Sequence, residues 1–176
     1  MGYFNQYVRA ESLEEAYGLY QKKNNFVLGG MLWLKMRKRP FGTAIDLSDL
    51  GLDQIEEDEK EFRIGAYVSL RELETNEALN TYTKGAFAES VKHIVGVQFR
   101  NVATVGGSLW GRYGFSDVMT IFRAMGAKVQ LHHAGILDLD EFVKMPRKTR
   151  DILAGARSTP RGASVRESPP RRPCTN

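Results

Sequence analysis

Hydrophobic and polar positions along the chain switch between helical and extended spacing. Residues 11–22 predict a helix, because a serine and a glutamate three residues later form a capping box and apolar residues recur on one helical stripe. An apolar strand at 25–30 then ends in two glycines, residues 31–39 predict a helix, and residues 43–50 predict another strand. This order predicts a compact βαβ unit at the start of the chain.

Mixed helical and extended patterns continue in the second part of the chain. The segment 69–76 repeats the capping-box spacing with Ser69 and Glu72, and the segment 116–126 has Ser116 or Asp117 at its start and Gly126 at its end, which are the usual cap residues. The fold class is therefore predicted to be α+β, with α/β character in the first unit. The expected strands lie at 61–69 and 127–133, and the expected helices lie at 69–76, 83–95, 116–126 and 136–143.

The texture of the sequence changes after Leu153. Residues 154–176 hold four of the six prolines and contain no aromatic residue and no Leu, Ile, Phe or Met. Such a segment buries too little apolar surface to offset the entropy of ordering, so we expect a disordered tail. We accordingly expect three parts: a first lobe at 1–54, a second, incomplete lobe at 55–153, and the tail, which is either a functional basic arm or the product of a frameshift.

The positive net charge of the chain comes from this tail. Five of the 25 basic residues and one of the 21 acidic residues lie in 154–176, which leaves 20 of each in the rest of the chain. The tail arginines could contact phosphates, but no aromatic residues lie between them and the body is neutral. We therefore do not expect nucleic acid as a partner.

Cysteine and histidine are scarce. Cys174 is the single cysteine, which excludes an internal disulfide and any metal or iron–sulfur site built from several cysteines of this chain. His132 and His133 are adjacent, and neighbours along a strand point to opposite faces. We expect two partly exposed strand residues there and no metal site.

The chain has no sequence feature of a membrane protein. No apolar run approaches the roughly 20 residues that span a bilayer, and the first residues lack the basic and apolar regions of a signal peptide. We expect a soluble, cytoplasmic protein.

Two glycine-rich segments are the strongest candidates for a binding site. The first glycine segment is Gly29-Gly30, between a predicted strand and a predicted helix, and the second is residues 104–111. Glycine lets the backbone approach a ligand closely, and free N–H groups near a helix start suit a phosphate or pyrophosphate. Neither segment has the P-loop or G-x-G-x-x-G pattern, and the alternative is that the glycines only allow tight turns.

The two segments together resemble a known family. The sequence VLGGMLWLKM at 27–36, followed by RNVATVGGSLWGRYGFSD at 100–117, resembles the FAD-binding (medium) subunit of molybdenum hydroxylases, the xanthine dehydrogenase and carbon monoxide dehydrogenase family. The resemblance covers residues 3–153 and implies a two-lobed FAD-binding fold of the PCMH type. The residues that match the second motif are Arg100, Asn101, Ala103, Thr104, Gly106, Gly107, Ser116 and Asp117.

The resemblance implies FAD as the cofactor and a role for residues of both segments. It implies that the first segment surrounds the pyrophosphate, that Asp117 binds a ribose or ribityl hydroxyl, and that Ile94 packs at the adenine end. Leu109 and Trp110 would flank the isoalloxazine ring. No catalytic residue and no metal ligand is implied. The implied cofactor-binding residues are Val27, Leu28, Gly29, Gly30, Met31, Ile94, Thr104, Gly106, Gly107, Ser108, Leu109, Trp110, Ser116 and Asp117.

The chain departs from the family pattern at a few positions and in length. Met31 stands where the family usually has threonine or a small residue, which removes a hydrogen bond to the pyrophosphate. Ser108 replaces asparagine and Gly114 replaces proline. Family members continue well beyond this length, so we expect a C-terminally truncated member.

The resemblance implies an electron-transfer role rather than substrate chemistry. The implied partners are a molybdopterin-containing large subunit, an iron–sulfur small subunit, and NAD or another electron acceptor. The cofactor would carry the redox chemistry while the protein binds and orients it. The alternative is a truncated, non-catalytic fragment or scaffold that does not retain flavin.

Overall fold

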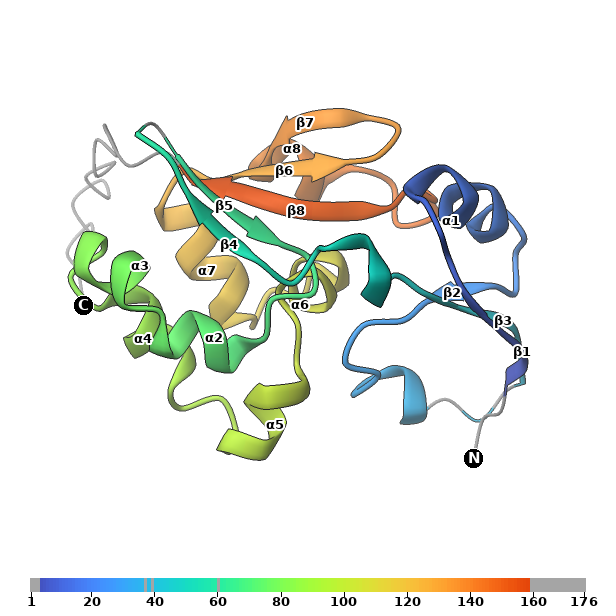
Figure 1. Ribbon diagram of the computed structural model, residues 1–176, viewed down its shortest axis with the longest axis horizontal. Helices are drawn as coiled ribbons and strands as arrows, with labels where there is room; N and C mark the ends of the chain where they lie inside the picture. Colours follow the sequence, from blue (N-terminus) through green and yellow to red (C-terminus); the bar gives the residue numbers. More distant parts are fainter. Residues whose placement is uncertain (1–3, 37, 39, 60, 159–176) are drawn as a thin grey trace, which may run out of the picture.

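The chain folds into two lobes, each built around its own sheet (Figure 1). The computed structural model describes residues 4–158, apart from residues 37, 39 and 60. The fold is mixed α+β, as the sequence predicts. No helix in this described part of the chain is long and apolar enough to cross a membrane.

The first lobe is a three-stranded parallel sheet in the order β1-β3-β2. The middle strand is the most buried, since Ile45 is fully covered and pairs with Val8 on one side and Val27 on the other. The lobe's elements are β1 (Phe4–Arg9), α1 (Leu13–Tyr20), β2 (Phe26–Val27), the 3₁₀ turn η1 (Leu34–Met36), β3 (Phe41–Asp46) and the 3₁₀ turn η2 (Ser48–Leu50).

The helix predicted at 31–39 is wrong. Among residues 31–36 and 38, which the structure describes, the single 3₁₀ turn η1 is the only helical element, and Met31 has a φ of +56°, in the left-handed region that an α-helix cannot include. The βαβ unit predicted from 25–30, 31–39 and 43–50 is therefore wrong as well; the helix between parallel strands of this sheet is α1, which follows β1 and precedes β2. The sequence patterns gave no indication of β1.

The second lobe is a five-stranded antiparallel sheet in the order β4-β5-β8-β6-β7. Helices α2 to α7 lie on one side of this sheet (Figure 1). Their buried side chains and the inward residues of the strands form one core. In this core the rings of Phe87 in α4 and Phe122 in α7 pack edge to face, with 5.2 Å between their centroids. The elements are β4 (Ile55–Glu57), β5 (Phe62–Gly65), α2 (Leu70–Thr75), α3 (Glu77–Tyr82), α4 (Ala86–Val91), α5 (Val97–Val102), α6 (Val105–Gly111), α7 (Asp117–Ala124), β6 (Lys128–Leu131), β7 (Gly135–Asp138), α8 (Leu139–Lys144) and β8 (Leu153–Ser158).

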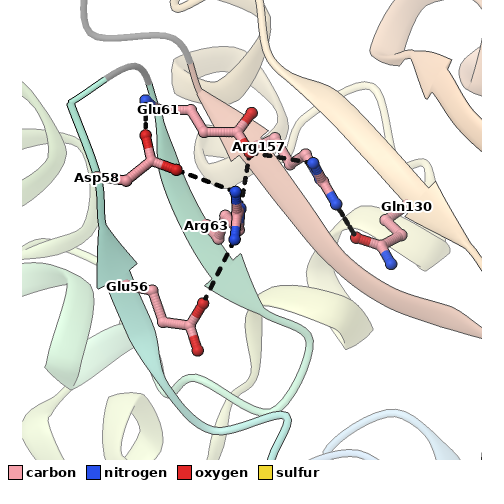
Figure 2. A network of polar contacts seen from close by, with 6 residues as sticks. All are labelled: Glu56, Asp58, Glu61, Arg63, Gln130 and Arg157. Carbon is pink, nitrogen blue, oxygen red and sulfur yellow. Dashed lines mark hydrogen bonds and ion pairs between the residues drawn. The ribbon is translucent and has the colours of Figure 1, made fainter.

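Strand β8 corrects the expected start of the tail. Residues 154–158, expected to be disordered, form most of the central strand between β5 and β6. Figure 2 shows that Arg157 bonds Glu61 of the β4–β5 turn at 3.0 Å and Gln130 of β6 at 2.9 Å. Glu61 also pairs with Arg63 at 2.7 Å, so this strand belongs to a polar network on the outer face of the sheet. The rest of the expected tail, 159–176, lies outside the described residues.

The two adjacent histidines also differ from expectation. Strand β6 ends at Leu131, so His132 and His133 lie in the following turn and both contact the ring of Tyr17, at 5.7 and 5.2 Å between ring centroids. His132 Nε2 lies 2.9 Å from a carboxylate oxygen of Glu14 in α1. The two histidines therefore join the second lobe to the first. Because they do not lie in a strand, the expectation that they point to opposite faces of a sheet is wrong.

Candidate cofactor-binding site

A cleft of about 820 Å³ lies between the two lobes. Both glycine segments line it, although they are separated by about seventy residues in the sequence. Thirteen of the fourteen expected cofactor-binding residues lie on its wall: Val27, Leu28, Gly29, Gly30, Met31, Ile94, Thr104, Gly106, Gly107, Ser108, Trp110, Ser116 and Asp117. A smaller pocket of about 290 Å³ lies beside α7 and contains none of these residues.

Leu109 is the exception. Its side chain is fully buried in the core of the second lobe, and it does not line the cleft. Successive residues of a helix point about 100° apart, so α6 turns Trp110 toward the cleft and Leu109 toward the core. The side chain of Leu109 therefore does not reach the cleft, and a place for this residue beside a flavin ring stays a prediction.

The first glycine segment is held against the end of α5. A Cβ on Gly30 would lie 2.0 Å from the carbonyl oxygen of Val102, so only glycine fits there. The N–H groups of Gly29, Gly30 and Met31 make no hydrogen bond to any described residue. Close packing of the chain thus requires the glycine, and it leaves three adjacent donors free in the cleft.

Tyr67 anchors the carbonyl that precedes these donors. Its hydroxyl donates to Leu28 O and accepts from Leu47 N at 3.0 Å, at the end of β3. Burial raises the pKa of Tyr67 to about 12, so the hydroxyl stays protonated at neutral pH. The sequence patterns did not single out this residue.

The second glycine segment is a helix and not the loop that the sequence suggested. Thr104 caps α6, and its Oγ1 accepts from Gly107 N at 3.2 Å. Gly106 packs on the backbone of Ala66, where a Cβ would lie 2.8 Å from the carbonyl oxygen. A Cβ on Gly29 would lie 3.0 Å from Thr104 Oγ1, so this hydroxyl lies between the two glycine segments.

Asp117 is the first residue of α7. Ser116 is the cap, because its hydroxyl accepts from Met119 N at 3.2 Å. The carboxylate of Asp117 is exposed and forms no hydrogen bond or ion pair with any described residue. It is therefore a free acceptor on the cleft wall, suited to a hydroxyl of a ligand.

Aromatic side chains surround one end of the cleft. The ring centroid of Trp33, from the first lobe, lies 5.5 Å from that of Tyr113, and Tyr113 stacks on Phe115 with 5.3 Å between ring centroids. All three side chains line the cleft. Trp110 packs at 5.7 Å on Phe142 of α8. The sequence patterns identified only Trp110 from this group.

Arg100, which belongs to the second motif, is buried and does not line the cleft. Its buried guanidinium bonds Glu74 of α2 at 2.8 and 3.3 Å and the carbonyl of Ile94 at 3.2 Å. Burial opposes ionisation of Glu74, but the hydrogen bonds from Arg100 and Arg71 outweigh it and hold the pKa of Glu74 below its ordinary value. The pair fixes α5 and thereby the position of Ile94.

Residues 146–152 form a third wall that sequence reasoning missed. They connect α8 to β8, and all but the first of them line the cleft. The cluster of basic residues from Arg147 to Arg150, directly after a helix, was the available signal. Within residues 4–158 that are described, no group of three or more His, Cys, Asp or Glu side chains is arranged to hold a metal ion.

The chemistry of the cleft fits a dinucleotide cofactor. Three free N–H donors suit the oxygens of a pyrophosphate, and Asp117 is free to accept from a hydroxyl. The aromatic end suits a planar ring system.

Comparison with known proteins identifies this arrangement. Residues 3–157 match the family described as FAD binding domain in molybdopterin dehydrogenase. The protein YgfM of Escherichia coli (strain K12) is 27% identical over 148 residues, which are 80% of this chain and 54% of YgfM. The chain thus spans about half the length of this curated relative.

Solved structures share the fold. Quinoline 2-oxidoreductase from Pseudomonas putida 86 matches with a TM-score of 0.77 at 19% identity, over 89% of this chain and 59% of that chain. Carbon monoxide dehydrogenase from Hydrogenophaga pseudoflava matches with a TM-score of 0.78 at 23% identity, over 88% and 58%. The chain therefore belongs to the family of FAD binding domains of molybdopterin dehydrogenases, and FAD is the cofactor of this family.

Proposed function

We propose that this chain is the FAD-holding, electron-transfer module of a molybdopterin-dependent dehydrogenase. The observation that carries the proposal is the set of free polar groups in the interlobe cleft. The N–H groups of Gly29, Gly30 and Met31 and the carboxylate of Asp117 have no described partner, and all line one cleft. The N–H groups of Gly29, Gly30 and Met31 are half-buried, and such polar groups normally find partners, so a polar ligand is the simplest account of their state; the exposed carboxylate of Asp117 is available to the same ligand.

Specific residues would then hold each part of FAD. The free N–H groups of the first glycine segment, with the hydroxyl of Thr104, would bind the pyrophosphate oxygens. Asp117 would accept from a ribose or ribityl hydroxyl, Trp110 would border the isoalloxazine ring, and Ile94 would pack at the adenine end. When bound, the flavin would take up and pass on electrons, and the chain would orient it and limit its contact with water.

The position of Met31 changes one expectation. We expected its side chain to cost a hydrogen bond that threonine supplies in the family. At a φ of +56°, however, a β-branched residue is strained. The backbone N–H of Met31 remains free for the pyrophosphate, so the main chain and not the side chain would make this contact.

The proposed partners follow from the family. We infer a molybdopterin-containing large subunit that oxidises the substrate, an iron–sulfur small subunit that relays electrons, and NAD or another acceptor that receives them. The similarity to carbon monoxide dehydrogenase and quinoline 2-oxidoreductase supports such an assembly. We propose that the chain is a flavin-dependent oxidoreductase subunit of the xanthine dehydrogenase-like type, in an assembly whose large subunit selects the substrate.

A flavin titration with two ligands tests the proposal. The full chain is titrated with FAD and, separately, with riboflavin, which lacks the pyrophosphate and the adenosine. FAD is expected to bind with a saturable change in its fluorescence, while riboflavin is expected to bind far more weakly because the glycine segments have no phosphate to contact. Equal binding of both would contradict the pyrophosphate assignment. Binding of neither by a folded chain would favour the alternative of a scaffold that does not retain flavin.

A further inference from the structure

Residues 146–152, called the strap below, lie between α8 and β8 of the second lobe and pack against the first lobe on the way. The side chain of Ile152 at one end is fully buried in the core of the first lobe, among residues such as Ala16 and Ile45. The other end follows α8 of the second lobe. The strap therefore belongs to both lobes and borders the cleft between them.

Arg150 binds the strap to the start of the first glycine segment. Its guanidinium donates to the carbonyl oxygens of Tyr20 at 2.6 Å, Lys22 at 2.9 Å, Asn25 at 2.8 Å and Lys23 at 3.3 Å. These carbonyls lie at the end of α1 and in the next turn, where helix geometry leaves acceptors unsatisfied and a cation is favourable. Asn25 directly precedes β2, so Arg150 fixes the point from which the chain enters Gly29-Gly30.

Arg147 binds the strap to the far end of the second glycine segment. Its guanidinium donates to the carbonyl oxygens of Gly111 at 2.8 Å and Arg112 at 2.9 Å, at the C-terminal end of α6. Arg112 in turn donates to the carbonyl of Met145 at 2.7 Å, directly before the strap. Arg147 of the strap thus bonds the end of α6, and Arg112 after α6 bonds Met145, the residue before the strap.

The strap also gives the cleft a positive wall. In the described part of the chain, neither Arg147 nor Arg150 forms an ion pair with a carboxylate, and Lys148 between them has no partner. Asp151 does not compensate these charges directly, because its carboxylate accepts from the N–H groups of His133, Ala134 and Ile152. The cleft wall is consequently suited to an anionic ligand.

We propose that Arg147 and Arg150 are positioning residues for FAD, which hold the two glycine segments at the separation that the pyrophosphate needs. The proposal rests on the proposed function, in which the cleft binds FAD. Guanidinium has five donors in a rigid fork, whereas a lysine ammonium is a point charge on a flexible stem. A lysine at 150 keeps the charge but cannot serve four carbonyls, so the chain before Gly29-Gly30 becomes free to shift.

The test compares Arg150→Lys and Arg147→Lys with a matched control. Arg123→Lys is the control, because Arg123 is exposed, pairs with Asp140 at 2.8 Å and does not line the cleft. FAD dissociation constants are measured by fluorescence titration of the full chain, together with urea unfolding and hydrogen exchange at Asn25 and Leu28, whose N–H groups bond Lys22 O and Ile45 O just before the first glycine segment. We expect Arg150→Lys to raise the dissociation constant about tenfold, comparable to losing one hydrogen bond to a charged group.

The outcomes separate this proposal from the proposed function. Weaker FAD binding in either strap variant, with faster exchange at Asn25 and Leu28 in Arg150→Lys and the control close to wild type, supports positioning. Lower urea stability with an unchanged dissociation constant means that the arginines serve only the fold and overturns the proposal. If Arg150→Lys does not fold, the result for Arg147→Lys decides. If wild type itself does not bind FAD, the proposed function fails first.

Discussion

Replacing Gly30 with alanine is expected to displace the first glycine segment and to disable the cleft. The added Cβ would lie 2.0 Å from the carbonyl oxygen and 2.7 Å from the carbonyl carbon of Val102, whereas ordinary contact begins at 3.4 Å. Both atoms are backbone, so no side-chain rotation relieves the overlap. The two chain segments must separate by more than an ångström, or by a smaller amount with strained angles.

Two magnitudes follow from this overlap. Forcing an extra methyl group into a close-packed site costs about 1–3 kcal/mol of unfolding free energy. The same displacement moves the N–H groups of Gly29 to Met31 away from the pyrophosphate, and each hydrogen bond to a charged group is worth about 1.5–3 kcal/mol. Loss of one such bond corresponds to a roughly ten- to hundredfold weaker affinity for FAD.

A second glycine provides the control. Gly18 lies in α1 and nothing would lie within 4 Å of an added Cβ, so Gly18→Ala is expected to raise stability by about 0.5–1 kcal/mol. Both variants are followed by urea unfolding with circular dichroism and by FAD titration. If Gly30→Ala unfolds like wild type and binds FAD with the same affinity, the close approach of Gly30 and Val102 is not what shapes the cleft.

Three further substitutions test separate contacts. Asp117→Ala should weaken FAD binding by about tenfold or more while changing the unfolding free energy by less than about 1 kcal/mol, because its carboxylate has no described partner; full flavin occupancy of the variant would refute the hydroxyl contact. Glu74→Gln should lower stability at neutral pH by about 2 kcal/mol, and urea titrations should show the difference shrinking as pH falls. The hydrogen bonds from Arg100 and Arg71 outweigh burial and hold the pKa of Glu74 in the folded state below its ordinary value. The stability that they provide is therefore lost as pH falls and Glu74 is protonated. Tyr67→Phe should cost about 1–3 kcal/mol, since Leu47 N loses its acceptor. Wild type, unlike this variant, should lose stability as pH rises from about 10 toward 12, because the unfolded tyrosine ionises first; parallel alkaline profiles would argue against a buried hydroxyl.

Local sequence signals predicted local structure well. Ser12 and Ser69 cap α1 and α2 as their capping-box spacing indicated. The glycine-rich stretch after Thr104 misled, because glycines usually lower helix propensity. Here they are helical, since Gly106 must pack on Ala66 and Thr104 caps the first turn.

The features that the sequence missed depend on contacts between distant residues. Strand β8 consists largely of small residues with weak strand preference, and Gly155 is required because a Cβ would lie 2.7 Å from Ile64 O in the neighbouring strand. That requirement is visible only once the sheet is assembled. The strap is similar, since Arg150 bonds carbonyls about 125 residues earlier in the chain, which no local pattern can reveal.

Whether the cleft holds FAD is decided by the absorbance spectrum of the purified full chain after incubation with FAD and desalting. Flavin bands are expected to remain with the protein in an equimolar amount and to be released on denaturation. A colourless protein that is still folded by circular dichroism would contradict this expectation, because the free N–H groups and the carboxylate of the cleft would then not suffice to hold the cofactor.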